Sequence, residues 1–285
     1  MICQQQSPCG NIRTKSSVLH RMGSLVVGTS LLLTSHALLA DTPEAIATDR
    51  PDFVESNATV GKGHFQIETS IAYDTKKSGA LKEDSYTTPT LLRYGFADAW
   101  EARLETDGAI HYKTRETNTN ISILERGATD LSLGVKWHTQ DETETGIRPA
   151  MAWLFHVDIP SGSDRFHGNG LRPSIRMTME WEFSEVYSLG IMPGIIHDKE
   201  VTGERFTAGL LGAVVGRAWT DKFRTFMEVA ASQIAGQKYG GAVVTYDVGG
   251  SCLITNMIQA DMAMSWGATH AAPDFSWTMG LSVKL

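Results

Sequence analysis

The sequence has almost no cysteine. Only Cys3, Cys9 and Cys252 occur among its 285 residues, and two of the three lie within the first ten. A disulfide framework requires at least one pair of cysteines in the mature fold. Because one cysteine remains beyond the N-terminal stretch, we expect backbone pairing and side-chain packing to hold the fold together.

Long apolar runs are also missing, with one exception near the start. Residues 22–40, MGSLVVGTSLLLTSHALLA, follow three basic residues and no acidic one. A basic region, a short apolar region and small residues at the end are typical of a secretory signal peptide. We predict that residues 1–40 are a cleaved signal peptide, cut after Ala40 or Ala37. A retained helical anchor is the alternative, although Gly, Ser, Thr and His interrupt the apolar region.

An excess of basic residues is absent as well. Removal of residues 1–40 takes away three of the 25 Lys and Arg and none of the 32 Asp and Glu, so the mature chain is strongly acidic. Nucleic-acid binding needs a basic face. The composition therefore argues against a nucleic-acid partner.

What the sequence does have is alternation with a period of two residues. In residues 64–74, HFQIETSIAYD, one strand face would carry Phe65, Ile67, Ile71 and Tyr73 and the other face polar side chains. The pattern recurs to Leu285 in about twelve segments of roughly 9–14 residues, long enough to cross a bilayer when tilted. The third segment is expected to continue one alternation from Trp100 to Ile110 and Tyr112, with His111 on the polar face.

The connections between these segments alternate in length. Residues 97–99, 184–185, 220–222 and 255–257 form short connections, whereas stretches such as 114–128 and 161–171 are long and polar. We predict an all-β fold: a single transmembrane antiparallel up-and-down β-barrel of about twelve strands over residues 64–285, with both mature termini periplasmic. A β-sandwich has shorter strands, and a lipocalin-like barrel has eight strands and an apolar interior.

Large aromatic residues support the membrane alternative. Trp100, Trp137 and Trp219 flank short connections on the apolar face, and Tyr73 and Tyr86 flank long ones. Aromatic girdles at both ends of the strands match the two interfaces of a membrane. The apolar face is then expected to contact lipid and the polar face to line a lumen.

The polar face carries many charges that we expect to line the lumen. Arg93 and Arg103 are predicted to oppose each other across one short turn, and Arg217 and Arg224 across another. Like charges opposed on a sheet are destabilising, so carboxylates should lie nearby. A self-neutralising polar wall is the alternative to a role in solute passage. The lumen candidates are Arg93, Arg103, Glu105, Lys136, His156, Arg176, Glu180, Arg217, Arg224 and Glu228.

The stretch TDRPDFVES, residues 48–56, places four charges just before the first strand. Residues 41–63 are predicted to form an N-terminal periplasmic segment that can fold into the lumen as a plug. Asp49 and Asp52 would contact the arginines, Arg50 the surplus acids, and Phe53 would cover part of the opening. A frayed terminus is the alternative.

The same stretch carries a resemblance. TDRPDF at residues 48–53 and GKG at 61–63, with LLRYGFADAWEARL, GATDLSLGVKW and DIPSG further on, resemble the family of MetA-pathway-of-phenol-degradation proteins, usually labelled outer-membrane transporters. The resemblance spans essentially the mature chain. It implies an outer-membrane β-barrel for small organic compounds, with aromatic or hydrophobic ones as candidates. Leu285 departs from the aromatic residue that usually ends such barrels.

Three functions compete on this basis. The first is a channel or transporter in the bacterial outer membrane, the second a non-conducting structural or binding barrel, and the third a lipid-modifying enzyme. An enzyme would need an outward Ser–His pair, which the pattern does not provide, so no catalytic residue is predicted. The expected partners are outer-membrane lipid, a small solute and the barrel-assembly machinery, which would contact the C-terminal strand. Neither a cofactor nor a metal site is predicted.

Overall fold

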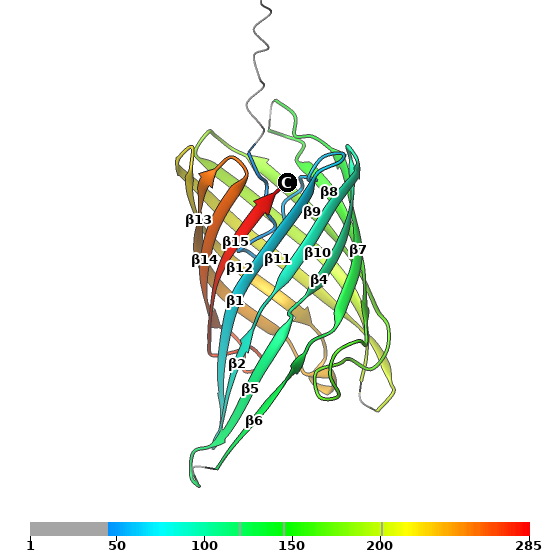
Figure 1. The fold of residues 1–285 in the computed structure, drawn as a ribbon, viewed down its shortest axis with the longest axis vertical. Coiled ribbons are helices and arrows are strands. Elements are labelled where there is room, and N and C mark those ends of the chain that lie inside the picture. Colours follow the sequence, from blue (N-terminus) through cyan, green and yellow to red (C-terminus); the bar gives the residue numbers. More distant parts are fainter. Residues whose placement is uncertain (1–44, 120, 145, 201) are drawn as a thin grey trace, which may run out of the picture. The chain divides into compact units, whose positions relative to one another are not determined.

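A computed structural model describes residues 45–285 except 120, 145 and 201. The predicted signal peptide and residues 41–44 lie outside the described residues. The described chain forms one antiparallel sheet that closes on itself, because β15 pairs with β1 (Figure 1). No helix in this part of the chain is long and apolar enough to cross a membrane.

Fifteen strand segments build twelve barrel strands, as predicted, because three of the barrel strands consist of two segments each. The segments are β1 (Phe65–Ser78), β2 (Leu81–Thr87), β3 (Thr90–Ala97), β4 (Trp100–Thr106), β5 (Ala109–Glu116), β6 (Ser122–Ala128), β7 (Leu131–Gln140), β8 (Ala150–Ile159), β9 (Arg172–Glu182), β10 (Tyr187–Lys199), β11 (Arg205–Thr220), β12 (Phe223–Ile234), β13 (Val243–Thr255), β14 (Ile258–Gly267) and β15 (Phe275–Lys284), with the short helix η1 (Gln237–Tyr239).

Side chains alternate between lumen and lipid along these strands, since successive side chains of a strand point to opposite faces. On β8, Trp153, Phe155 and Val157 face outward, whereas Leu154 and His156 face the lumen and are buried. On β12, Met227 is 69% exposed and its neighbour Glu228 is 4% exposed. An apolar outer face of this kind is what a bilayer requires of a barrel.

The rim that contains the short connections β3–β4, β9–β10, β11–β12 and β13–β14 is called the turn rim below, and the opposite rim the loop rim. The C-terminus lies at the turn rim, at the top of Figure 1. At the loop rim the end of β1 continues with β2, β5 and β6 into a sheet that protrudes beyond the rest of the barrel (Figure 1).

Residues 114–128, expected as a long loop, mostly belong to this protruding sheet. They form the end of β5, a turn and the whole of β6. The expectation was wrong because the apolar and polar alternation of a barrel strand is imposed by lipid. A strand that extends beyond the bilayer meets water on both faces, and its sequence then looks like a polar loop.

The interruption between β4 and β5 also corrects the predicted orientation of β5. Gly108 adopts φ +71° there, and the strand resumes with the opposite phase. His111 therefore pairs with the outward Tyr86, whereas Ile110 points inward and is 9% exposed. The prediction that Ile110 and Tyr112 face outward and His111 inward was wrong for this reason.

Two prolines within predicted strands have local explanations. Pro89 lies in the gap between β2 and β3, where no ladder hydrogen bond is required of it. Pro193 lies in β10 at a point where the pairing with β9 pauses between Ile191 and Gly194 without a change of register. Both prolines thus occupy positions where the sheet does not need their missing N–H group.

Candidate functional site

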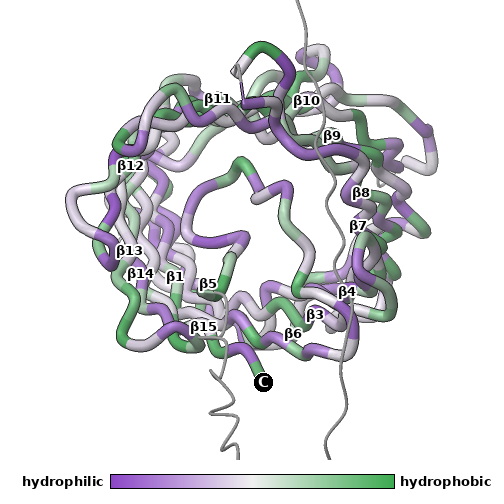
Figure 2. Tube along the Cα trace, turned by 90° about the horizontal axis from the view of Figure 1, so that it is seen from above, coloured by the Kyte–Doolittle hydropathy of each residue, from purple (hydrophilic) through white to green (hydrophobic). Residues whose placement is uncertain are grey.

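Residues 45–62, called the lumen segment below, begin and end at the turn rim and lie inside the ring of strands (Figure 2). The Ile46 N–H donates to the Asn256 carbonyl in one short connection, and the Gly63 N–H donates to the Gly95 carbonyl beside another, both at 2.7 Å. Ile46, Val54 and Val60 are each at most 5% exposed. The segment is therefore packed inside the lumen along much of its length.

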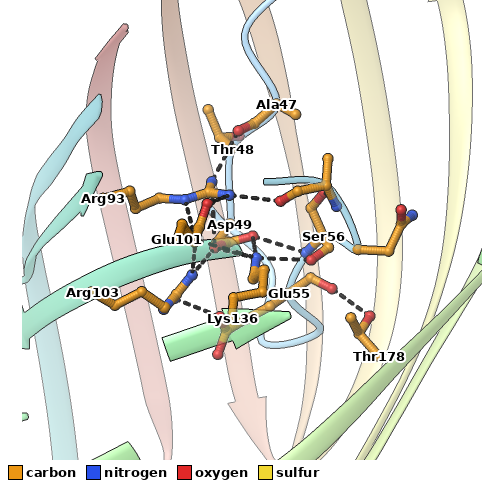
Figure 3. A network of polar contacts seen from close by, with 12 residues as sticks. Ala47, Thr48, Asp49, Glu55, Ser56, Arg93, Glu101, Arg103, Lys136 and Thr178 are labelled. Carbon is orange, nitrogen blue, oxygen red and sulfur yellow. Dashed lines mark hydrogen bonds and ion pairs between the residues drawn. The ribbon is translucent and has the colours of Figure 1, made fainter. Parts of the chain in front are cut away.

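Asp49 is the centre of the contacts on one wall (Figure 3). Both carboxylate oxygens accept hydrogen bonds from Lys136 Nζ at 2.7 Å, and Oδ2 also accepts one from Arg103. Arg93 Nη1 lies 3.4 Å away, and the Ser56 N–H donates to Oδ1 at 3.0 Å. Burial raises the pKa of Asp49, but the three cations outweigh it and hold the pKa well below its usual range.

The wall around Asp49 carries opposed arginines neutralised by acids. Arg93 and Arg103 are direct register partners on β3 and β4. Glu101 Oε1 accepts from both, at 2.8 Å from Arg93 Nε and 2.9 Å from Arg103 Nη1. Glu68 Oε1 accepts a further bond from Arg93 at 2.9 Å. The carboxylates that like-charge repulsion requires are thus supplied by the strands themselves.

Glu55 extends this network to β9. Its carboxylate accepts from Arg103 Nη2 at 2.6 Å and from Arg176 Nη1 at 2.7 Å, and its carbonyl accepts from Thr178 at 2.6 Å. Glu55 was absent from the predicted plug residues although it belongs to the stretch TDRPDFVES. The negative charge of Glu55 could have suggested a contact with the arginines. The sequence does not show that Glu55 and Asp49, six residues apart, both contact Arg103.

The opposite wall holds the segment by its backbone and by apolar contacts. The N–H groups of Phe53 and Val54 each donate to Glu228 at 2.8 Å. Val54 packs in a buried cluster with Met192, Leu210, Val214, Phe226 and Ala263, and Phe53 packs against that cluster. Arg50 donates to Thr278 at 2.7 Å and lies 3.4 Å from Asp261. The lumen wall is therefore mainly charged on one side and combines an apolar patch with a few acids on the other.

A glycine makes room for these apolar residues. A Cβ atom added at Gly212 would lie 2.6 Å from Val54 Cγ2 and 2.9 Å from a Phe53 ring carbon. We expect Gly212→Val to displace the segment from this wall, because contacts that short cannot be kept. Proteolysis near Pro51 should accelerate and conductance in planar bilayers should increase several-fold.

The matched control is Gly209→Ala on the same strand. Its added Cβ would lie at an ordinary 3.6 Å from Ile234 Cβ on the outer face. That variant should behave as the wild type. Wild-type proteolysis and conductance in Gly212→Val would show that the contact between this wall and the segment does not close the lumen.

The remaining predicted lumen residues fall into several places. Glu105 accepts from Arg103 at 2.7 Å, His156 Nε2 lies 3.2 Å from Arg103 Nε, and Glu180 accepts from Asn57. Arg224 faces the lumen 3.9 Å from Asp52, which has no closer basic partner among the described residues. Burial raises the pKa of Asp52 to about 6, so Asp52 is a weak anchor compared with Asp49.

Arg217 does not belong to the lumen, and the prediction that it does was wrong. Arg217 pairs with Thr225, and Ala218 pairs with Arg224, because a bulge between Ala218 and Thr220 shifts the register by one residue. The guanidinium of Arg217 instead lies over the ring of Trp219, 3.8 Å from its centroid, on the outer face. That position is typical of an interfacial aromatic belt.

Two cavities lie on either side of the lumen segment. One, of about 680 Å³, extends toward the loop rim and is lined by residues that include Asp107, Asp130, Asp158 and His167. The other, of about 670 Å³, extends toward the turn rim and reaches Glu182. Asp52 and Glu55 line both cavities. The lumen segment thus forms the partition between them.

Comparisons with solved structures place this fold among outer-membrane barrels. The COG4313 outer membrane channel from Pseudomonas putida F1 superposes with a TM-score of 0.62 at 10% sequence identity, covering 83% of this chain and 99% of the channel. The beta domain of the Bordetella autotransporter BrkA gives a TM-score of 0.51 at 10% identity, covering 78% and 99%. These likenesses show the fold: a closed outer-membrane-type β-barrel, shared with a channel and an autotransporter domain.

Sequence comparison supplies the family. No curated protein matches the chain. A family model described as "Putative MetA-pathway of phenol degradation" matches residues 48–285, which include most of the lumen segment and the whole barrel. The chain belongs to this MetA-pathway family of phenol degradation.

Proposed function

We propose that this protein is an outer-membrane channel for small organic compounds, in which the lumen segment sets the width of the path. The observation that carries the proposal is the pair of cavities within the barrel, both lined by Asp52 and Glu55. The lumen segment alone separates the two cavities, so a solute in one cavity is one layer of polypeptide away from the other. The family name adds aromatic and other hydrophobic compounds as candidate solutes.

The two walls of the lumen suit such solutes. Apolar residues that line the cavities include Phe53 and Leu131 in the first and Val54 and Val214 in the second, and these can contact an apolar ring. The wall around Asp49 is charged and hydrogen-bonded, which favours polar substituents. A solute with a small apolar body and a polar group fits both walls, as in binding sites generally.

The proposal includes orientation and export. Both ends of the lumen segment lie at the turn rim, and the barrel strands are even in number, so we place the turn rim in the periplasm and the loop rim outside the cell. Export through residues 1–40 as a signal peptide is part of the same proposal. The outer-membrane lipid and the assembly machinery at β15 remain the partners that we propose.

The function is tested by reconstituting the full mature chain in planar bilayers and liposomes. We expect small, stable conductance steps, and faster liposome swelling with a monosaccharide or a hydroxybenzoate than with a trisaccharide. Gly212→Val should raise both readouts. Absence of conductance and of swelling in both proteins would overturn the channel and favour the non-conducting binding barrel.

An enzyme is the weaker candidate. The superposed structures are a channel and an autotransporter domain, and neither is named as an enzyme. On the outer face of the described residues, His197 Nδ1 lies 3.1 Å from the Thr207 hydroxyl. In the described part of the chain, no acid is hydrogen-bonded to that histidine, so the pair lacks the third group of a hydrolytic triad. We therefore propose passage of solutes rather than chemistry on them.

A further inference from the structure

The protruding sheet at the loop rim has two faces of different charge. Its outward face continues from Tyr73 and Tyr86, whose rings lie 4.7 Å apart at the outer surface. Register pairing then assigns each following residue to a face. The outward basic face, as it is called below, consists of Lys77, Lys82, Lys113, Arg115 and Arg126.

These five cations form one patch because the strands align them in rows. Lys77 pairs with Lys82, and Lys82 pairs with Arg115. Two residues closer to the tyrosines, Asp84 pairs with Lys113, and Tyr86 lies in a row with His111 and Arg126. Cross-strand neighbours on one face are about 5 Å apart, so the positive charges are adjacent in space.

Among the residues of β1, β2, β5 and β6, the outward basic face carries one acid, Asp84. Its carboxylate lies 3.1 Å from Lys82 Nζ and also accepts hydrogen bonds from Tyr73 and Thr75. Beside β1, the Asp274 carboxylate accepts a hydrogen bond from the backbone N–H of Lys77 at 2.8 Å and forms no ion pair with its side chain. In the described part of the chain, no carboxylate lies within ion-pair distance of the other four cations. The acids of the same strands, Glu83, Glu116 and Glu125, take the opposite phase and point inward.

This arrangement is costly without an anionic partner. Like charges that face each other directly on a sheet destabilise it, and Lys77, Lys82 and Arg115 are consecutive in one row. The protein as a whole has a net charge of −7, so a cluster of positive charges is not expected from its composition. The lumen arginines obtain neutralising acids from the barrel strands, whereas four of the five cations of the outward basic face have no carboxylate of the described residues within ion-pair distance.

Its height in the membrane indicates the partner. Tyr73 and Tyr86 are at the position of an interfacial aromatic girdle, where rings lie at the level of lipid headgroups. The cations lie level with these tyrosines or up to four residues beyond them, which is at most about 14 Å along the strands. Phosphate groups of lipids occupy this zone on the outer surface of a barrel.

We propose that the outward basic face binds the phosphate groups of lipopolysaccharide in the outer leaflet. The proposal rests on the orientation given above, with the loop rim outside the cell, and not on solute passage. Arg115 and Arg126 can each hold a phosphate through two N–H groups, and the lysines add point charges. Bound phosphates would neutralise the row of like charges that the sheet leaves unpaired.

The experiment measures binding of diphosphorylated lipid A to the full mature protein in detergent by native mass spectrometry. The test variant is Lys113→Gln/Arg115→Gln/Arg126→Gln. We expect its dissociation constant to rise by roughly 100-fold, because each basic residue near an anionic lipid surface contributes about 1 kcal/mol. Arg115→Gln alone should raise the constant about fivefold, which keeps the test valid if the triple variant folds poorly.

The matched control is Lys62→Gln/Arg148→Gln/Lys222→Gln, which removes the same charge from exposed positions at the turn rim. It should bind lipid A as the wild type does. Wild-type affinity in Arg115→Gln and the test variant, or an equal loss in the control, would overturn the proposal. Equally tight binding of phosphatidylglycerol would replace lipopolysaccharide with anionic lipid in general and would overturn the assignment of the outer leaflet.

Discussion

Replacing Asp49 with Asn should release the lumen segment and raise the mean conductance of the barrel several-fold. Asp49 Oδ2 accepts hydrogen bonds from Arg103 and Lys136. Asn has an NH₂ group in place of one carboxylate oxygen and carries no negative charge. In either orientation of the amide, one acceptor is therefore lost and N–H donors face the cations. Lys136 would then keep the Ser56 carbonyl at 2.9 Å and Glu101 at 4.0 Å. Its buried ammonium would lose its closest anion.

The size of this effect follows from burial. Arg103, Lys136 and Asp49 side chains are at most 2% exposed, so removing one partner leaves uncompensated charge in the protein interior. Breaking a buried ion pair in this way costs roughly 3–5 kcal/mol. That amount shifts the population of the undocked segment by a factor of about 100 or more. Limited proteolysis near Pro51 measures the shift independently of conductance.

Asp52→Asn provides the control, because it removes the same charge three residues along the segment. Asp52 lies 3.9 Å from Arg224 and is otherwise buried without a basic partner among the described residues. Since burial raises its pKa to about 6, the charged form at pH 7 opposes docking. Asp52→Asn should therefore leave the segment docked or hold it more firmly. If Asp52→Asn opened the lumen as much as Asp49→Asn, the assignment of Asp49 as the anchor would be wrong.

The barrel strands could be predicted from the sequence where lipid constrains them. On β9 every outward position needs an apolar residue, so Ile175, Met177 and Met179 stand out against polar neighbours. The same constraint places Lys136 and Arg176 inward without any knowledge of the fold. Contact with the bilayer thus makes the outward-facing positions of barrel strands predictable from the sequence.

The lumen and the protruding sheet lack that constraint. Leu210, Val214 and Phe226 are apolar and point inward, because they contact Val54 rather than water. The periodicity of the strand sequence does not predict such a contact, because the contact depends on where a segment distant in the chain packs. The break between β4 and β5 and the bulge before Thr220 are also local features. Each of them moves the residues beside it to the face of the barrel opposite to the one that simple alternation predicts.

Arginine on the outer face at mid-barrel should destabilise the protein by roughly 2–4 kcal/mol, because it places a charge in lipid. Leu104 faces outward on β4, four residues from Trp100, which stacks on Trp137 at 5.0 Å in the girdle of the turn rim. Four residues correspond to about 14 Å along a strand, roughly half the height of the apolar band. Met179 on β9 lies four residues before Phe183, which directly follows the strand.

Leu104→Arg and Met179→Arg should thus lower the free energy of unfolding in lipid vesicles by comparable amounts, measured by urea titration with tryptophan fluorescence. Ser132→Arg is the matched control on a lumen-facing position. Ser132 pairs with Glu105 on one side and Asp158 on the other, so the new guanidinium would meet carboxylates and water rather than lipid. Ser132→Arg should fold with nearly wild-type stability. Equal losses in all three variants would mean that the two faces of the barrel wall are assigned wrongly.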